Sequence, residues 1–341
     1  MRYACFALLL TWWAGSSAAF DIEESHSYPA GASELRILST ADQAVFDPIL
    51  RSFQAENPEI SIVYDVAGST GVMAAIQDEG ALYDLVISSA MDLQTKLAND
   101  GLAQAYLSEA TARLPAWASW RDMVFAFTQE PAVLVVNDRL FRDLETPRNR
   151  AGLIELLRGN PQVFRGRIGT YDVRRSGLGY LFATQDSRNT ESYWRLTEVM
   201  GRLETQLYCC SGEMITDVAS GDLALAYNVL GSYARVRLKD TPGIRVVEME
   251  DFVSVMLRSA LIPMNARAVE EAGLMIDFLA GMSNRPELVQ ATGLPPVSLD
   301  ARDGDESVLR PIRLGPGLLV FLDRMRRETF LRSWVSSVEQ E

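Results

Sequence analysis

Two adjacent arginines, Arg174 and Arg175, stand where a bound anion could be neutralised. They follow a predicted strand at residues 166–172 and precede Ser176 and Gly177, which open a predicted helix. An arginine can bind a carboxylate or phosphate through two parallel hydrogen bonds, and a helix N-terminus offers free N–H groups to the same anion. The chain carries 32 basic and 45 acidic residues, a net charge of -13. General attraction to polyanions is therefore excluded as the reason for this pair, and we look for a local one.

The two arginines are not expected to act alike. Because Arg174 and Arg175 are neighbours in an irregular loop, their side chains should point in different directions, one into a site and the other to solvent or to an acid. The sequence leaves the choice open, and we favour Arg174. Both are kept as candidate ligand-binding residues.

Small polar residues follow several other predicted strands. In open α/β sheets, ligands bind beyond the carboxyl ends of the strands, against helix N-termini. A hydroxyl at a helix start is usually an N-cap, so capping alone is the alternative to ligand contact at each loop. The recurrence of such residues after several strands favours contact with a ligand. The candidate ligand-binding residues are Ser39, Thr40, Gly68, Ser69, Thr70, Ser88, Ser89, Arg174, Arg175, Ser176, Gly177, Ser211 and Asn228.

Alternating strands and helices must position these residues. Phe46, Ile49, Leu50 and Phe53, for example, recur at helical spacing after a short apolar strand. This alternation predicts an α/β fold with largely parallel sheets and helices on both faces. Strands are expected at 35–40, 60–68, 83–90, 131–137, 166–172, 222–228 and 254–263, and helices at 41–58, 69–80, 91–101, 150–159, 178–185, 190–203, 214–219, 266–281, 285–292 and 317–338.

The first residues indicate export. Arg2 precedes an apolar run at 3–14, and small residues end at Ala19, the pattern of a secretory signal that is cleaved after Ala19. The run is shorter than the roughly 20 apolar residues of a membrane-spanning helix. We expect a periplasmic protein in which residues 20–33 form a flexible leader. This leader holds His26, the only histidine of the chain.

Only two cysteines, Cys209 and Cys210, lie beyond the predicted signal. An oxidising compartment would allow a disulfide between them. However, the Cα atoms of adjacent residues are closer together than the usual disulfide geometry prefers. We therefore expect two buried free thiols, with a vicinal disulfide as the alternative.

The segments ILSTADQAVFDPILRSFQAENP, YDLVISS and DVASGDLALAYN give the chain a family resemblance. It resembles the periplasmic solute-binding proteins of ABC importers, in the branch that binds ferric ion, hexose phosphate or phosphoglycerate. The resemblance implies a two-lobed fold of two doubly wound α/β lobes, joined by hinge strands, that close on a ligand. By position it implies hinge strands at 131–137 and 254–263, lobe one at 34–130 plus 260–341, and lobe two at 131–259.

The chain departs from the ferric-ion binders of this branch. The resemblance implies consecutive tyrosines directly after the strand that matches LALAYN in a ferric binder. Here Asn228 is followed by residues 229–232 and only then by Tyr233. The loop at residues 39–42 lacks the His or Glu that ferric binders often place there. We therefore expect no metal site, and instead a small organic anion.

We therefore expect a non-enzymatic protein, without a cofactor, that captures a phosphorylated or carboxylated metabolite between its lobes for an ABC permease. Acids such as Asp42 and Asp172 leave a carboxylate-only enzyme as a weaker hypothesis, since no nucleophile–base pair is readable. The main alternative is a ligand sensor that docks on a membrane histidine kinase. The negative charge argues against nucleic acid and anionic membranes as partners, and we expect a monomer. The sequence does not identify the solute.

Overall fold

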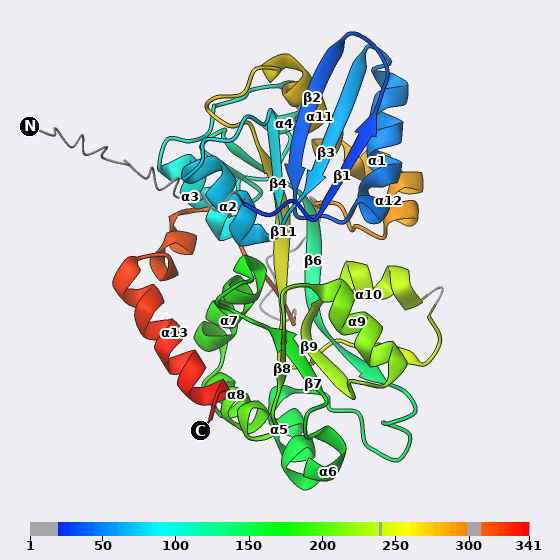
Figure 1. Ribbon diagram of the computed structural model, residues 1–341, viewed down its shortest axis with the longest axis vertical. Coiled ribbons are helices and arrows are strands. Elements are labelled where there is room, and N and C mark those ends of the chain that lie inside the picture. The colour runs from blue at the N-terminus through cyan, green and yellow to red at the C-terminus, as the bar shows by residue number, and fades with distance from the viewer. Residues whose placement is uncertain (1–19, 239–240, 299–307, 341) are drawn as a thin grey trace, which may run out of the picture.

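The computed structural model describes residues 20–238, 241–298 and 308–340. It consists of two α/β lobes, one above the other in Figure 1, that are connected by two long strands. Strand β6 (Val124–Asn137) pairs along its first half with β11 (Val253–Leu261) and along its second half with β9 (Leu225–Leu230). The predicted α/β fold is confirmed; β6 includes the strand expected at 131–137, and β11 covers most of the strand expected at 254–263. The signal predicted at residues 1–19 lies outside the described residues.

Lobe one is built on a mixed sheet with the strand order β1-β3-β2-β4-β11-β6. Strand β2 (Ser33–Ser39) is parallel to β3 (Ile60–Val66) and β4 (Leu85–Ser88), as the alternating pattern predicts. The short strands β5 (Ser119–Trp120) and β12 (Leu309–Pro311) extend it. Its helices are α1 (Gln43–Glu56), α2 (Ser69–Gln77), α3 (Met91–Asn99), α4 (Glu109–Ala112), α11 (Val269–Ala280), η1 (Met282–Asn284) and α12 (Pro286–Thr292).

The flexible leader predicted at residues 20–33 is wrong. Residues Glu24–Tyr28 form strand β1, which pairs with β3 in antiparallel register. Tyr28 is buried, and its hydroxyl donates a hydrogen bond to Asp47 at 2.8 Å. This strand is hard to predict, because Tyr28 is its only large apolar residue and its pairing depends on a strand more than thirty residues later.

Lobe two holds a second sheet, in which β7 (Ile168–Tyr171) lies parallel to both β8 (Gln206–Tyr208) and β9. Strand β10 (Ile244–Val247) pairs with β6 on the other side. The helices of this lobe are α5 (Arg150–Gly159), α6 (Pro161–Phe164), α7 (Gly177–Asn189), α8 (Ser192–Arg202), α9 (Ser211–Ser220) and α10 (Gly231–Leu238).

The C-terminal segment differs from the expected lobe division, which assigned residues 260–341 to lobe one. The 3-10 helix η2 (Pro316–Phe321) does pack on α3 of lobe one. However, the following helix α13 (Arg324–Val338), red in Figure 1, packs on α8 of lobe two. Its Phe330 and Trp334 are buried in a cluster with Tyr193 of α8. An amphipathic pattern indicates that a helix packs, but not on which lobe.

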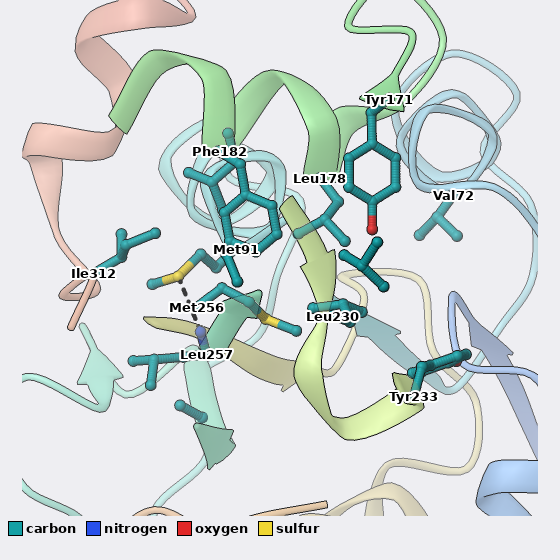
Figure 2. Packing of buried hydrophobic residues seen from close by; sticks show 14 of the residues in the cluster. Val72, Met91, Tyr171, Leu178, Phe182, Leu230, Tyr233, Met256, Leu257 and Ile312 are labelled. Atoms are coloured by element: carbon teal, nitrogen blue, oxygen red, sulfur yellow. Dashed lines mark hydrogen bonds between the residues drawn. The ribbon is translucent and has the colours of Figure 1, made fainter. Parts of the chain in front are cut away.

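Both lobes contribute to one hydrophobic cluster near the crossing strands (Figure 2). Met91 of α3 lies beside Phe182 of α7, and the backbone N–H of Leu257 in β11 donates to the Met91 sulfur at 3.4 Å. The next residue of β11, Arg258, is fully buried and its Nε donates to Glu130 of β6 at 2.9 Å. Within the residues described, no helix is long and apolar enough to cross a membrane.

Candidate functional site

A small cleft, with a cavity volume of about 70 Å³, lies between the lobes. It forms where the carboxyl ends of β2, β3 and β4 in lobe one face those of β7 and β8 in lobe two, the position at which open α/β sheets bind ligands. The N-termini of α2, α7 and α9 also reach it. The lining residues are Glu23, Thr40, Asp42, Ala67, Gly68, Ser69 and Ser89 from lobe one, and Tyr171, Arg175, Ser176, Leu178, Cys209, Cys210, Ser211, Gly212, Leu230 and Tyr233 from lobe two.

The structure brings seven of the candidate residues together in this lining. They come from five loops that are far apart in sequence, which agrees with the expectation that strand ends gather at one place. The seven are Thr40, Gly68, Ser69, Ser89, Arg175, Ser176 and Ser211. The other six, which do not line the cleft, are Ser39, Thr70, Ser88, Arg174, Gly177 and Asn228.

Three of these six residues have structural roles away from the cleft. The hydroxyls of Ser39 and Ser88 accept hydrogen bonds from the N–H groups of Ala41 and Ala90, at 3.0 and 3.1 Å. The side chain of Asn228 points into lobe two, where its amide donates to a buried carboxylate at 2.8 Å. For Ser39 and Ser88 the hydroxyl stabilises its own turn, the alternative to ligand contact that sequence reasoning left open.

The two arginines do point in different directions, but Arg175 rather than the favoured Arg174 lines the cleft. Arg174 makes two hydrogen bonds to Asp172, at 2.8 and 2.9 Å, and an ion pair with Glu339 at 2.7 Å. Although burial raises the pKa of Asp172, the Arg174 bonds outweigh it and lower that pKa overall. Among the described residues no ion pair involves Arg175, so its charge is available to a guest.

Hydrogen bonds join the lobes across the cleft. The N–H of Gly177 donates to Ser69 Oγ at 2.9 Å, and Thr70 Oγ1 donates to the carbonyl oxygen of Arg175 at 2.9 Å. On the other side, the N–H of Asp42 donates to the hydroxyl of Tyr233 at 3.1 Å. Thr70 and Gly177 thus connect the two lobes at the edge of the cleft.

The three helix N-termini at the cleft are not equivalent. Ser176 caps α7, since its hydroxyl accepts from the N–H of Gly179 at 3.1 Å. By contrast, no side chain caps α2 or α9, whose preceding residues are Gly68 and Cys210. Uncapped N–H groups and the positive end of the helix dipole favour an anionic group nearby.

Two carboxylates line the cleft that were not among the predicted ligand-binding residues: Glu23, and Asp42, which the sequence offered only as a possible catalytic acid. Burial raises the pKa of Glu23, and the negative charges of Asp42 and Asp21 raise it further. Burial also raises the pKa of Asp42, although the charge of Arg258 partly opposes this. Glu23 was hidden in the supposed leader. In the part of the chain that the structure describes, no group of three or more His, Cys, Asp or Glu residues is arranged to hold a metal.

Two phenols, Tyr171 and Tyr233, also line the cleft and were not predicted there. Burial raises the pKa of each phenol above its usual value. Both are therefore neutral at physiological pH and act as hydrogen-bonding groups. Tyr171 pairs with the hydroxyl of Ser211 and Tyr233 with the backbone of Asp42, so each orients a neighbouring lining residue.

The prediction of two buried free thiols is wrong. Cys209 and Cys210 form a disulfide, with their Cα atoms 3.8 Å apart, and both are only half-buried because they line the cleft. The distance is that of any two residues joined by a trans peptide. The turn between β8 and α9 brings the two side chains to the same side, which the sequence did not reveal.

Two lobes, crossing strands and a polar cleft between them define a solute-binding protein. The chain matches the family model "bacterial extracellular solute-binding protein" over residues 35–291, and it belongs to this family. The family binds and delivers solutes rather than catalysing reactions, so the resemblance seen in the sequence and the expectation of a non-enzyme are both confirmed. No curated protein sequence matches the chain.

Solved structures support this assignment. The substrate-binding protein of an ABC transporter from Agrobacterium tumefaciens is 31% identical, with a TM-score of 0.86, over 92% of this chain and 98% of that one. AfuA from Actinobacillus pleuropneumoniae, with fructose-6-phosphate bound, is 14% identical, with a TM-score of 0.73, over 91% and 100% of the two chains. Iron-bound HitA from Pseudomonas aeruginosa is 16% identical, with a TM-score of 0.69, over 90% and 99%. The last two similarities show the fold alone.

Proposed function

We propose that the protein captures a small organic anion that also carries hydroxyl groups, such as a phosphorylated or carboxylated sugar derivative, and delivers it to an ABC permease. The observation that carries this proposal is the meeting of Arg175 and two uncapped helix N-termini with two carboxylates in one cleft. The guanidinium and the helix N-termini suit a negative group, and the two carboxylates suit hydroxyl groups that donate hydrogen bonds.

The anionic group of the solute would lie near Arg175 and the start of α9. A guanidinium gives charge-assisted hydrogen bonds to phosphate or carboxylate oxygens. The N–H groups at the start of α9 and the hydroxyl of Ser176 add donors on the same side of the cleft. Backbone donors at a helix N-terminus bind such anions without any further charge.

The hydroxylated part of the solute would face Asp42 and Glu23. A purely anionic guest would be repelled by these carboxylates, whereas sugar hydroxyls can donate hydrogen bonds to them. Thr40 and Ser89 lie on the same side, with their hydroxyl oxygens 3.2 Å apart, and can donate or accept. Fructose-6-phosphate, which AfuA binds in a similar fold, combines the two kinds of group.

We place the protein in import rather than sensing. The structure from Agrobacterium tumefaciens, which is 31% identical over 92% of this chain, belongs to an ABC transporter. This favours a permease over a histidine kinase as the partner. The proposal includes export to the periplasm with cleavage after Ala19, action as a monomer, and closure of the lobes on the solute by bending at β6 and β11.

A thermal-shift series on the mature chain tests this function. Fructose 6-phosphate, 3-phosphoglycerate and gluconate should each be compared with fructose and with inorganic phosphate. At a hundred times its Kd, a solute stabilises the folded state by about 2.7 kcal/mol, which raises the Tm by roughly 5 °C in a chain of this size. We expect this rise in Tm from at least one hydroxylated anion, and a smaller rise from fructose alone or from inorganic phosphate alone. Stabilisation by neutral or cationic solutes only would contradict the proposal.

A further inference from the structure

The Cys209–Cys210 disulfide occupies a defined place in the cleft wall. It joins the end of β8 to the start of α9, and Cys210 is the residue before the first turn of that helix. Both cysteines and the next two residues, Ser211 and Gly212, line the cleft. The bond closes a ring over one peptide unit, so it restricts the backbone torsions that set the direction of α9.

Ser211, directly after the disulfide, connects this turn to the rest of lobe two. Its hydroxyl pairs with the phenol of Tyr171, from the end of β7. It also accepts a hydrogen bond from the N–H of Leu230, at the end of β9, at 3.2 Å. All three residues line the cleft. A change in the backbone at Cys210 would therefore move donors and surfaces contributed by three different strand ends.

The disulfide also differs chemically from its neighbours. Arg175, Ser176 and Ser211 are polar, whereas bonded sulfur is polarizable and makes favourable contacts with C–H groups. A solute that carries hydroxyls on one edge has carbon faces that need such a surface. The disulfide thus supplies a rigid, weakly polar wall beside the groups that bind charge.

We propose that the Cys209–Cys210 disulfide fixes the lobe-two wall of the cleft in its solute-binding shape, so that reduction by a dithiol weakens solute binding. The consequence for affinity rests on the proposed function. In the reaction the S–S bond breaks and the two sulfurs take up two electrons and two protons, while the dithiol becomes a cyclic disulfide.

The first measurement needs no ligand. Hydrogen–deuterium exchange is followed on the mature protein before and after dithiothreitol, with reduction verified by titration of two new thiols. We expect the Leu230 amide, which donates to Ser211, and the first amides of α9 to exchange at least tenfold faster after reduction. The Cys209→Ser/Cys210→Ser double variant should resemble the reduced protein and ignore dithiothreitol, which controls for effects of the reagent elsewhere.

The second measurement compares affinities for fructose 6-phosphate and the other anions of the thermal-shift series in the oxidised and reduced proteins. We expect at least a tenfold rise in Kd on reduction. Unchanged exchange after verified reduction, or a disulfide that resists dithiothreitol in the folded protein, would overturn the inference whatever the solute is. Faster exchange with unchanged affinity for a bound anion would overturn it too. Faster exchange when no anion of the series binds the oxidised protein would support the fixed wall and count against the proposed solute class.

Discussion

The backbone N–H of Gly177 donates a hydrogen bond to Ser69 Oγ across the cleft, at 2.9 Å. Ser69 is the first residue of α2 in lobe one, and Gly177 is the first residue of α7 in lobe two. The two helices therefore meet at their N-terminal ends. This bond can form only when the lobes are in contact. The contact leaves little room for a side chain at residue 177, so it requires glycine there.

Gly177→Ala should hinder closure of the lobes. A Cβ at Gly177 would lie 2.7 Å from Leu93 Cδ1 and 3.0 Å from Ser69 Oγ, both on lobe one. In the open state that the proposed hinge motion implies, an added Cβ would not meet these two atoms. We expect a larger radius of gyration in small-angle scattering and about a tenfold or greater loss of solute affinity. The matched control is Gly159→Ala, where an added Cβ meets nothing within 4 Å. Equal behaviour of the two variants would contradict the role assigned to Gly177.

Arg175→Ala should weaken binding of the anionic solute, and Arg174→Ala should not. Arg175 lines the cleft, whereas Arg174 is held by Asp172 and Glu339. Loss of one hydrogen-bonded charge partner costs about 1.5–3 kcal/mol, or roughly ten- to a hundredfold in Kd. Isothermal titration calorimetry with the best anion of the thermal-shift series measures both variants. A larger loss in Arg174→Ala would reverse the assignment.

Asp92 should make stability depend on pH. It is buried in α3, and within the described structure its Oδ1 has no hydrogen-bond partner. Burial raises the pKa of Asp92 from 3.8 to about 7, with the charge of Arg327 in α13 opposing the rise. The folded state therefore binds more protons than the unfolded state between these values. The contribution of Asp92 to the free energy of unfolding therefore falls as pH rises from about 4 to about 7, and it is constant above pH 7.

Urea denaturation at pH 5 and pH 7.5 checks this dependence in the wild type and in Asp92→Asn. The variant cannot ionise at this position, so its stability should change less between the two pH values. The limit for one group is about 1.4 kcal/mol per pH unit. The exposed Asp78, changed to Asn, serves as the control. The same pH dependence in all three proteins would show that Asp92 is not the responsible group.

Glu130→Gln should strongly destabilise the strands that connect the lobes. Glu130 is fully buried and accepts from Arg258 and Thr128, each at 2.9 Å, and from Ser232. Removing the carboxylate leaves the Arg258 charge buried without its ion pair, which costs about 3–5 kcal/mol. Chemical denaturation measures the loss. Glu198→Gln, in an ion pair with Arg202 on the surface of α8, should change little by comparison.

Much of the fold could be predicted because its signals are local. The spacing of Phe46, Ile49 and Phe53 requires a helix with one buried face, and all three are buried in α1. Strand β1 could not be predicted in this way, because its residues form a strand only by pairing with β3, and a local pattern does not show that pairing. The position of α13 depends on Phe330 and Trp334 finding partners in lobe two, and a helical pattern contains no information about those partners.

The site was predictable to the extent that topology determines it. Hydroxyl residues after parallel strands meet at one edge, and Thr40, Ser69 and Ser89 do so. The choice between Arg174 and Arg175 depends on backbone torsions in one loop, which residue types do not specify. Asp42 was visible as an acid beside a predicted strand end, but the contribution of Glu23 required knowing that the leader folds.

The packing of α13 on α8 has a consequence for the order of folding during synthesis. In the chain as described, α13 follows every strand of both sheets, including β12 of lobe one. The aromatic cluster around Tyr193 and Trp334 therefore stays incomplete while the ribosome is still making the return segments of lobe one. Lobe two is begun before the return segments of lobe one but is completed only by α13, which follows them, so its apolar face around Tyr193 has no cover until α13 is made.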